Sequence, residues 1–303
     1  MKFFYYFPGR WVPHVPELLS VEAHAAQTTA AAAAGFIGVS TDEHPIPSEP
    51  WRNGPGGHDA LDPFVVLGAV AASAPDMKLL TYLAVVPFRN PFLLAKQAAT
   101  LDVLSGGRLI LGVGTGYQEP EFQALGVDFD ERNALFDEGL EVMKLAWTGE
   151  PVSYRGAHFR AEQVRARPTP VARPHPPLWI GGNSRLTMRR VVDSAQGWMP
   201  MPNARDRTRP GRSVALESLD DLARLKSYMD RYAAEQGRTA PIEILCSLTV
   251  PDTSPAEVID HLGRLEEIGV GWVSAGGRSR CLAEALEWID RFGAEVIAPC
   301  SAR

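Results

Sequence analysis

Residues 178–194 read LWIGGNSRLTMRRVVDS, a short apolar run followed by a glycine-rich turn and a helical pattern. Leu178–Ile180 is apolar at every position, as expected of a strand buried on both faces. The turn Gly181–Ser184 passes directly into the predicted helix Arg185–Ser194. A strand that leads straight into a helix is the repeating unit of parallel sheets covered by helices, so this stretch predicts an α/β protein.

The same unit recurs along the whole chain. Its helices carry ordinary start and stop signals, such as the cap Asn90 and the paired glycines Gly106-Gly107, and Ser218 and Ser254 begin two later helices. The expected strands are Lys2–Phe7, Phe36–Ser40, Lys78–Val86, Arg108–Val113, Leu178–Ile180, Trp198–Met201, Ile242–Leu248 and Gly271–Ala275. The clearest expected helices are Val21–Ala34, Phe136–Trp147, Arg185–Ser194 and Leu282–Val296.

Eight apolar strands that do not alternate, separated by helices, imply a parallel sheet that is covered on both faces or closed on itself. Eight units in 303 residues fit a closed (β/α)8 TIM barrel better than an open sheet. A doubly wound sheet is the alternative architecture. We expect residues 1–303 to form a single domain.

Two segments interrupt this rhythm. Residues 150–177 are rich in proline and contain a predicted hairpin, Val152–Tyr154 against His158–Arg160, which we interpret as an insertion before strand five rather than a linker. Residues 202–216 are polar and rich in arginine, and we expect them to form a mobile loop after strand six.

Composition excludes several classes of protein. A formal net charge of -6 argues against a nucleic-acid partner, which usually meets a basic face. The three cysteines form no CxxC pair, so neither a disulfide framework nor a structural zinc site is expected. No apolar run approaches the roughly 20 residues that cross a bilayer, and the apolar start Met1–Phe7 ends at Pro8, too short for a signal core. We predict a cytoplasmic protein that makes no membrane contact.

The turn Gly181–Ser184 is the first candidate for binding. In barrels of this kind the active site lies at the carboxyl ends of the strands, where this turn falls. Backbone N–H groups of Gly182 and Asn183 meet the positive end of a helix dipole there, and the Ser184 hydroxyl adds a donor, which together suit an anion. The alternative is that the glycines make the turn and Asn183 or Ser184 only caps the helix.

A second glycine-rich turn, Gly112-x-Gly114-x-Gly116, follows strand four. It is not a GxGxxG motif, and no acidic residue follows at the end of a suitable second strand, so a Rossmann role is disfavoured. Two readings remain open. The backbone forms a wall for a flat cofactor, or the small residues simply let a loop pass close to its neighbours.

His44 is the candidate acid or base. It stands beside Asp42 and Glu43 at the end of strand two, where a carboxylate can fix the tautomer of the ring. A purely structural histidine is the alternative. Tyr117 and Glu119 could add a hydroxyl and a carboxylate to the same mouth of the barrel, although Glu119 equally suits the first turn of a helix.

No HExxH, Walker loop, GxSxG or ordered Cys/His set is present in the sequence, which leaves hydrolase, kinase and metal sites without support.

Three aromatic residues stand near the ends of the expected strands. Trp51, Phe88 and Trp198 could form the walls of a site for a planar ligand. Side chains at such positions equally serve as lids over the core, so both interpretations stay open.

Three stretches resemble the luciferase-like monooxygenase family. They are NPFLLAKQAATLDVLSGGR at 90–108, LGVGTGY at 111–117 and RPHPPLWIGGNS at 173–184. Gly35-Phe36 and Asp42-Glu43-His44 agree with the family as well. The resemblance extends over residues 1–300, specific in the middle motifs and generic in the last third, and it is strongest to the branch that uses the deazaflavin coenzyme F420.

The resemblance implies a barrel with an insertion before strand five and a lid at residues 202–216. It implies a cofactor phosphate on Gly182, Asn183 and Ser184, and a flat ring near His44, Val85, Gly116 and Tyr117. It also implies a non-proline cis peptide near Leu83–Val86 and a homodimer.

Three functions follow as hypotheses. The first is an oxidoreductase that transfers a hydride between coenzyme F420 and a small organic substrate, with His44 bonding the substrate oxygen or taking its proton. The second is a monooxygenase that uses reduced FMN. The third is a flavin-binding barrel without turnover. Aromatic side chains near the expected pocket hint at a mostly apolar substrate.

Overall fold

The computed structural model describes residues 1–7, 15–54, 56–203, 214–248 and 254–302. Eight parallel strands close on themselves: β1 pairs with both β2 and β11, and pairing between β3 and β5 completes the circle. The predicted (β/α)8 barrel is therefore confirmed. In barrel order the strands are β1 (Lys2–Tyr6), β2 (Gly38–Thr41), β3 (Lys78–Thr81), β5 (Leu109–Gly114), β8 (Leu178–Gly181), β9 (Gly197–Met199), β10 (Glu243–Leu248) and β11 (Trp272–Ala275).

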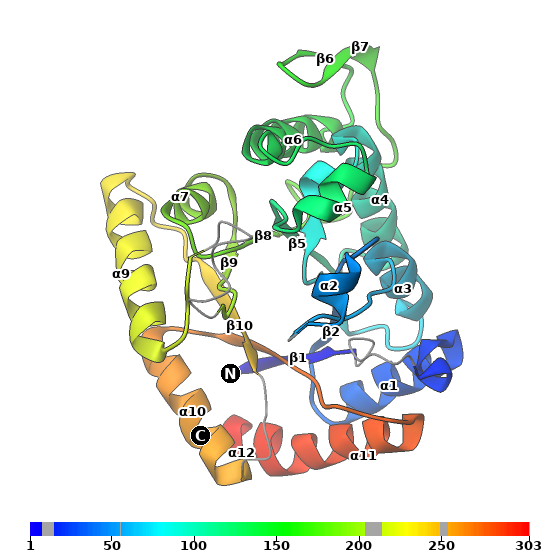
Figure 1. The fold of residues 1–303 in the computed structure, drawn as a ribbon, viewed down its shortest axis with the longest axis vertical. Helices are drawn as coiled ribbons and strands as arrows, with labels where there is room; N and C mark the ends of the chain where they lie inside the picture. Colours follow the sequence, from blue (N-terminus) through cyan, green and yellow to red (C-terminus); the bar gives the residue numbers. More distant parts are fainter. Residues whose placement is uncertain (8–14, 55, 204–213, 249–253, 303) are drawn as a thin grey trace.

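Helices surround the barrel on its outside (Figure 1). The longer ones are α1 (Val21–Ala33), α3 (Pro63–Val70), α4 (Pro91–Leu104), α6 (Arg132–Trp147), α7 (Arg185–Ser194), α9 (Leu219–Glu235), α10 (Pro255–Ile268) and α11 (Leu282–Phe292). Shorter ones are η1 (Pro16–Leu19), α2 (Glu49–Arg52), η2 (Val86–Phe88), α5 (Glu119–Ala124), η4 (Gly293–Ile297) and α12 (Ala298–Ser301).

The predicted helix starts are confirmed by their hydrogen bonds. Asn90 caps α4, and Ser184 accepts the backbone N–H of Thr187 at the start of α7. Ser218 and Ser254 each form a complete capping box, so the helices α9 and α10 begin where the sequence places them.

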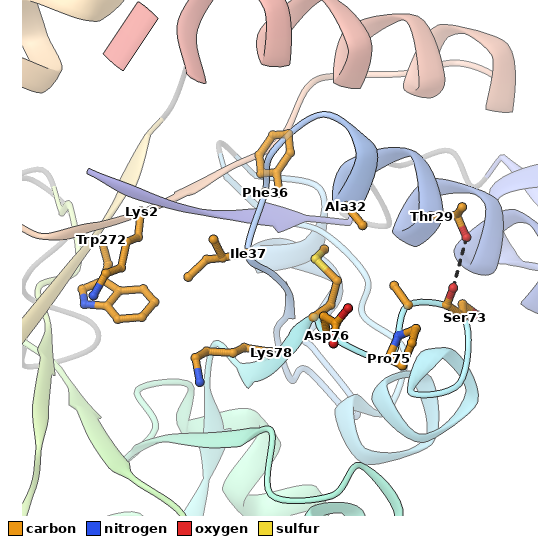
Figure 2. Close-up of a pocket in the computed structure, with 12 residues that line it drawn as sticks. Lys2, Thr29, Ala32, Phe36, Ile37, Ser73, Pro75, Asp76, Lys78 and Trp272 are labelled. Carbon is orange, nitrogen blue, oxygen red and sulfur yellow. Dashed lines mark hydrogen bonds between the residues drawn. The ribbon is translucent and has the colours of Figure 1, made fainter. Parts of the chain in front are cut away.

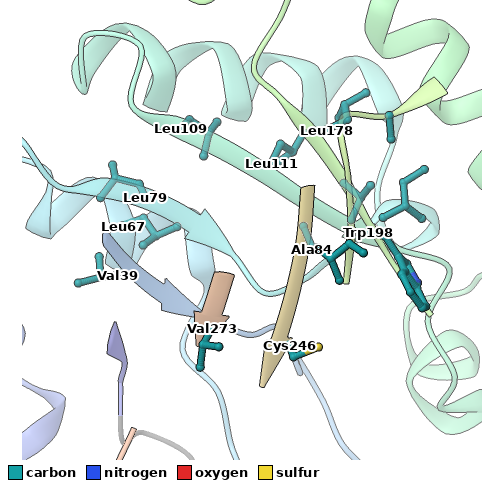
Figure 3. Close-up of a cluster of buried hydrophobic side chains, with 14 of the residues drawn as sticks. Val39, Leu67, Leu79, Ala84, Leu109, Leu111, Leu178, Trp198, Cys246 and Val273 are labelled. Atoms are coloured by element: carbon teal, nitrogen blue, oxygen red, sulfur yellow. The ribbon is translucent and has the colours of Figure 1, made fainter. Parts of the chain in front are cut away.

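Two apolar layers hold the barrel together. The outer layer lies between strands and helices and includes Leu79, Leu109 and Val273, drawn in Figure 3. The inner layer fills the barrel, where the rings of Trp179 and Trp272 meet edge to face at 5.1 Å. Because the interior is packed with side chains, a ligand can reach only the two ends of the barrel.

The predicted hairpin in the insertion is present, but its second strand lies further along the chain than expected. The strand β6 (Val152–Arg155) pairs with β7 (Arg160–Val164), so the second strand begins at Arg160, where the predicted one ends. His158 lies in the turn instead, because its backbone N–H donates to the carboxylate of Glu138 on α6 at 3.0 Å. The carboxylate of Glu138 thus accepts a backbone N–H that pairing between two strands would otherwise use.

The predicted third strand is divided. β3 ends at Thr81, and β4 (Ala84–Val85) follows after a cis peptide bond between Tyr82 and Leu83. β4 still pairs with β5, Ala84 facing Val113. A non-proline cis peptide was expected near Leu83–Val86, and the observed bond involves Leu83, the first residue of that segment.

Other differences are local. The fourth expected helix begins at Arg132 rather than Phe136, and the helices α2 and α3 were not expected. The helix α5 begins at Glu119, in agreement with the alternative given for that residue. Of the expected loop 202–216, residues 204–213 lie outside the described residues, and its two flanks meet in an antiparallel bridge between Asn203 and Leu216.

Candidate active site

The residues proposed from sequence gather at one side of the carboxyl rim. β2, β3, β5 and β8 are consecutive in the barrel. His44 follows β2, Val85 lies in β4 at the end of β3, Gly116 and Tyr117 follow β5, and Gly182 follows β8. The tertiary structure thus brings together elements that lie far apart in the sequence.

Leu83 lies between the two glycine-rich strand ends. A Cβ atom on Gly181 would lie 2.2 Å from a methyl group of Leu83, and one on Gly114 would lie 2.7 Å from another. Neither strand end tolerates a side chain here. The glycines of both motifs therefore let the backbone approach the segment that follows the cis peptide.

His44 is held by polar side chains from one neighbouring loop and helix. Its Nδ1 lies 3.1 Å from Oε2 of Glu121 and 3.1 Å from the side-chain amide of Gln118. Its Nε2 lies 3.5 Å from the hydroxyl of Tyr117. A carboxylate can only accept, so pairing with Glu121 places the hydrogen of a neutral ring on Nδ1 and leaves the lone pair of Nε2 toward Tyr117. The amide nitrogen of Gln118 can only donate, so its contact with Nδ1 is not a hydrogen bond in that tautomer.

Glu121 is the residue that sequence reasoning missed. It lies in α5 and is only 1% exposed, and its second oxygen accepts the backbone N–H of Ile46 at 3.3 Å. Glu119, which the sequence suggested, is exposed and bonds Gln123 of its own helix. The two acids are neighbours on one short helix, and only the fold shows which of them faces His44.

The carboxylates beside His44 in sequence do not orient it. Glu43 accepts the backbone N–H of Val85 at 2.7 Å and contacts the guanidinium of Arg89. Its side chain is almost fully buried. Glu43 therefore ties the end of β2 to the end of β4, a structural role that differs from the expected one.

Asp42 pairs with a second histidine, His58. One oxygen of Asp42 lies 2.6 Å from Nε2 of His58 and also accepts the hydroxyl of Tyr6. Burial alone would raise the pKa of Asp42, but the hydrogen bond and charge of His58, aided by His44 and Tyr6, lower that pKa to about 2. Asp42 is therefore ionised across the neutral range.

Aromatic rings surround His44. The ring centre of Trp51 lies 4.5 Å from that of His44, and those of His58 and Tyr117 lie at 4.8 and 5.9 Å. Of the three aromatics proposed as walls, Trp51 alone contacts His44. Phe88 packs into a cluster with Phe122 and Phe129, and Trp198 is fully buried.

The turn Gly181–Ser184 lies at the predicted rim, but its side chains are engaged. The amide of Asn183 donates to the carbonyl of Met201 at 2.7 Å and accepts the N–H of Met201 at 2.9 Å. Ser184 caps α7. The backbone N–H groups of Arg185 and Leu186 open that helix, and both residues are exposed. The side chains of Asn183 and Ser184 are therefore already engaged within the protein.

Gly116 has a backbone that suits glycine alone. Its φ is +74°, and a Cβ there would lie 2.8 Å from both Phe122 and Val85. The turn after β5 therefore passes tightly over Val85, the residue expected near the flat ring.

A cavity of about 670 Å³ lies at the opposite end of the barrel (Figure 2). Lys2, Lys78 and Trp272 line it from the starts of their strands, beside Asp76 of the preceding loop. No residue proposed for the site borders it. The carboxyl rim, not this cavity, carries the histidines and carboxylates that could do chemistry.

Neither metal nor membrane features occur in the described part of the chain. No group of three histidine, cysteine, aspartate or glutamate side chains there could hold a metal ion. Nor is any helix in those ranges both long and apolar enough to span a bilayer.

Comparison with known proteins agrees with this fold. The family model described as luciferase-like monooxygenase matches residues 1–268. Uncharacterized protein Rv0953c of Mycobacterium tuberculosis is 32% identical over 237 residues, covering 78% of this chain and 76% of its own. The FMNH(2)-dependent dimethylsulfone monooxygenase of Pseudomonas putida is 30% identical over 148 residues, which cover 48% of this chain and 40% of that enzyme.

Solved structures share the fold. The monooxygenase RslO1 from Streptomyces bottropensis has a TM-score of 0.82 at 21% identity, covering 99% of this chain and 100% of its own. An F420-dependent secondary alcohol dehydrogenase in complex with an F420-acetone adduct has a TM-score of 0.77 at 17% identity, covering 98% of both chains. The relatives include both flavin and deazaflavin enzymes, and the chain belongs to the luciferase-like monooxygenase family, whose members are oxidoreductases.

Proposed function

We propose that this chain transfers a hydride between coenzyme F420 and a small organic substrate at the carboxyl rim of its barrel. The observation that carries the proposal is the arrangement of His44. Its Nδ1 faces the buried carboxylate of Glu121, which leaves Nε2 directed toward Tyr117. A histidine held in this way can accept a proton from a substrate hydroxyl as the carbon is oxidised, or return it in the reverse direction.

The residues at the rim fit a cofactor with a flat ring and a phosphate. The turn after β5 carries Gly116 over Val85, a close backbone wall with no side chain of its own. The turn at Gly182–Ser184 leads into α7, whose first N–H groups have no partner within the helix. Ser184 caps that helix, and Asn183 ties the turn to Met201, so we assign the phosphate mainly to backbone donors.

A bound deazaflavin would supply a two-electron hydride carrier. His44 would then bond the substrate oxygen through Nε2 and exchange its proton, while Glu121 stabilises the imidazolium that forms. Tyr117 is 44% exposed beside Nε2 and would donate its hydroxyl to the same oxygen. Trp51 would exclude water from one side of His44.

A panel of cofactors tests the proposal directly. Fluorescence titration of the purified protein with F420 and with FMN, oxidised and reduced, should give clearly tighter binding of F420. Oxygen consumption with reduced FMN serves as the counter-test. Tight FMN binding with substrate-dependent oxygen uptake would replace this proposal by the monooxygenase alternative. That alternative is favoured by the dimethylsulfone enzyme among the relatives. Binding without any turnover would favour the non-catalytic flavin barrel.

A histidine variant tests the catalytic assignment. His44→Ala should reduce turnover by about 10²- to 10⁴-fold, the usual contribution of a general acid or base, while cofactor affinity stays near wild type. His261→Ala, on the distant helix α10, is the control and should retain full turnover. Equal rates in the His44 variant would remove that residue from the mechanism.

The phosphate turn has its own matched pair of variants. Asp and Asn are both good helix caps, so Ser184→Asp and Ser184→Asn keep α7 capped, but only the former adds a negative charge. Cofactor affinity should fall much further in Ser184→Asp. Similar affinities in the two variants would show that the corner is a plain cap.

We also propose that the enzyme is a cytoplasmic homodimer of one-domain chains. α3 and α4 are neighbours, and each exposes a large apolar side chain, Val65 at 70% and Leu93 at 55%. Leu61 is exposed just before α3. Apolar side chains on adjacent helices are typical of surfaces covered by a partner. Cys246 and Cys281 form no disulfide, as is usual in the cytoplasm.

A further inference from the structure

A second histidine belongs to the site. His58 is only 3% exposed, and both of its ring nitrogens face oxygen acceptors. Nε2 lies 2.6 Å from the carboxylate of Asp42, and Nδ1 lies 3.0 Å from the carbonyl of Gly56. A carbonyl oxygen and a carboxylate oxygen accept hydrogen bonds and cannot donate them, so the two contacts together suit a ring that carries a hydrogen on each nitrogen.

His58 also anchors the segment that carries Trp51. Among the described residues from 45 to 62, His58 is the sole buried side chain. It is held through charge, by Asp42 at the end of β2, rather than through apolar packing. The turn beside it is tight, since a Cβ on Gly57 would lie 1.9 Å from the carbonyl oxygen of Trp51.

The ring of His58 contacts both rings of the proposed site. It meets His44 edge to face, with ring centres 4.8 Å apart, and lies 5.0 Å from Trp51. Other groups that face the pair are Tyr6, which donates to Asp42, and Glu121, which faces the far side of His44. His58 therefore contacts both the His44 ring and the Trp51 ring, and it belongs to the same segment as Trp51.

We propose that His58, protonated and paired with Asp42, is a positioning residue that holds Trp51 and His44 as one rigid platform at the substrate side of the pocket. His58 cannot itself touch substrate, because both of its nitrogens are occupied and its ring is covered. The proposal deepens the function proposed above and rests on it for the role of His44. The protonation of His58 and the placement of Trp51 are independent of that function.

Nuclear magnetic resonance of histidine labelled with ¹⁵N tests the protonation. The signals of His58, assigned by their loss in His58→Phe, should show two protonated nitrogens at pH 7 to 8. Asp42→Asn keeps an acceptor oxygen but removes the charge, and His58 should then become neutral. A singly protonated His58 in the wild-type protein would overturn the proposal.

Tryptophan emission tests the placement without any reaction. The fluorescence of Trp51 is obtained as the difference between the spectra of the wild-type protein and of Trp51→Phe. Because an adjacent imidazolium quenches tryptophan fluorescence, the intensity from Trp51 should increase in His58→Phe and in Asp42→Asn. The fluorescence intensity of Trp51 should not change in Asp59→Asn, the control variant that breaks the Arg52–Asp59 ion pair of the same loop. Unchanged Trp51 emission in both site variants would contradict the platform.

Turnover completes the test. His58→Phe keeps a flat ring but loses the ion pair, and its kcat should fall about 10- to 100-fold, as expected when a reacting group is misplaced by about 1 Å. Cofactor affinity should stay near wild type, and Asp59→Asn should keep full kcat. If His44→Ala is inactive and His58→Phe is not impaired, the positioning role is wrong. If both are fully active, the proposed function fails, and the spectra alone decide the state of His58.

Discussion

Nδ1 of His44 lies 3.1 Å from Oε2 of Glu121, although the two residues are 77 positions apart in the chain. Glu121 is buried and His44 lies at the rim, so the carboxylate contacts the ring from the side of the protein interior. This single contact decides which ring nitrogen faces the mouth of the barrel, and with it what His44 can do.

Replacing Glu121 should impair catalysis. Glu121→Gln keeps an oxygen that can accept from Nδ1 but removes the charge that stabilises the protonated ring. We expect turnover to fall at least about 10-fold, which is part of the roughly 10²- to 10⁴-fold that a general acid or base contributes. Glu119→Gln, on the same helix but exposed, should keep wild-type rates. Equal steady-state kinetics of the two variants would show that Glu121 has no special role.

Asp42 should make folding sensitive to acid. Its folded pKa is about 2 against an ordinary 3.8, so its ionised form contributes stability above pH 4 that is lost as the pH falls toward 2. The shift corresponds to about 2 kcal/mol at pH 5. Denaturant unfolding should show Asp42→Asn less stable than wild type at pH 5, with the difference shrinking toward pH 2. A constant difference at all pH values would exclude this linkage.

Gly116 should be hard to replace. Gly116→Ala combines a left-handed backbone with close contacts to Phe122 and Val85, and we expect a loss of about 2 to 4 kcal/mol in the free energy of unfolding. Gly106→Ala is the control, because its φ is also positive, at +67°, yet a Cβ there meets nothing within 4 Å. It should lose about 1 kcal/mol. Equal losses on urea unfolding would mean that crowding contributes nothing.

The hairpin of β6 and β7 should loosen at alkaline pH. The carboxylate of Glu138, with that of Glu131, raises the pKa of His158 above its ordinary value. A raised pKa means that this stabilisation is full below about pH 6.5 and is lost as the pH rises through the folded value. Hydrogen exchange across Arg160–Val164, corrected for its intrinsic pH dependence, should therefore be more protected at pH 5.5 than at pH 8.5. His158→Gln should abolish that difference, and His261→Gln should preserve it.

The exposed apolar face should mediate dimerisation. Leu93→Arg or Val65→Arg places a charge on the proposed interface and should yield monomers in analytical ultracentrifugation. Leu104→Arg changes a leucine at the other end of α4 that is even more exposed than Leu93, and it should leave the oligomeric state unchanged. A wild-type protein that sediments as a monomer would refute the homodimer.

The sequence by itself determined the barrel and the rim on which the site lies. Strand periodicity, helix caps such as Asn90 and Ser254, and turns such as Gly181–Ser184 are local signals, because each depends on residues within a few positions. These signals also placed His44, Tyr117 and Gly116 at the ends of strands, because parallel strands of a barrel all end on one side.

Only the tertiary structure decided which side chains meet. The carboxylate partner of His44 is Glu121 rather than the adjacent Glu43 or the similar Glu119. Asp42 pairs with His58 instead. These contacts join segments 16 to 77 residues apart. No periodic pattern encodes them, because hydrogen bonds between side chains depend on distances of a few ångströms that are fixed only when helices and strands pack together.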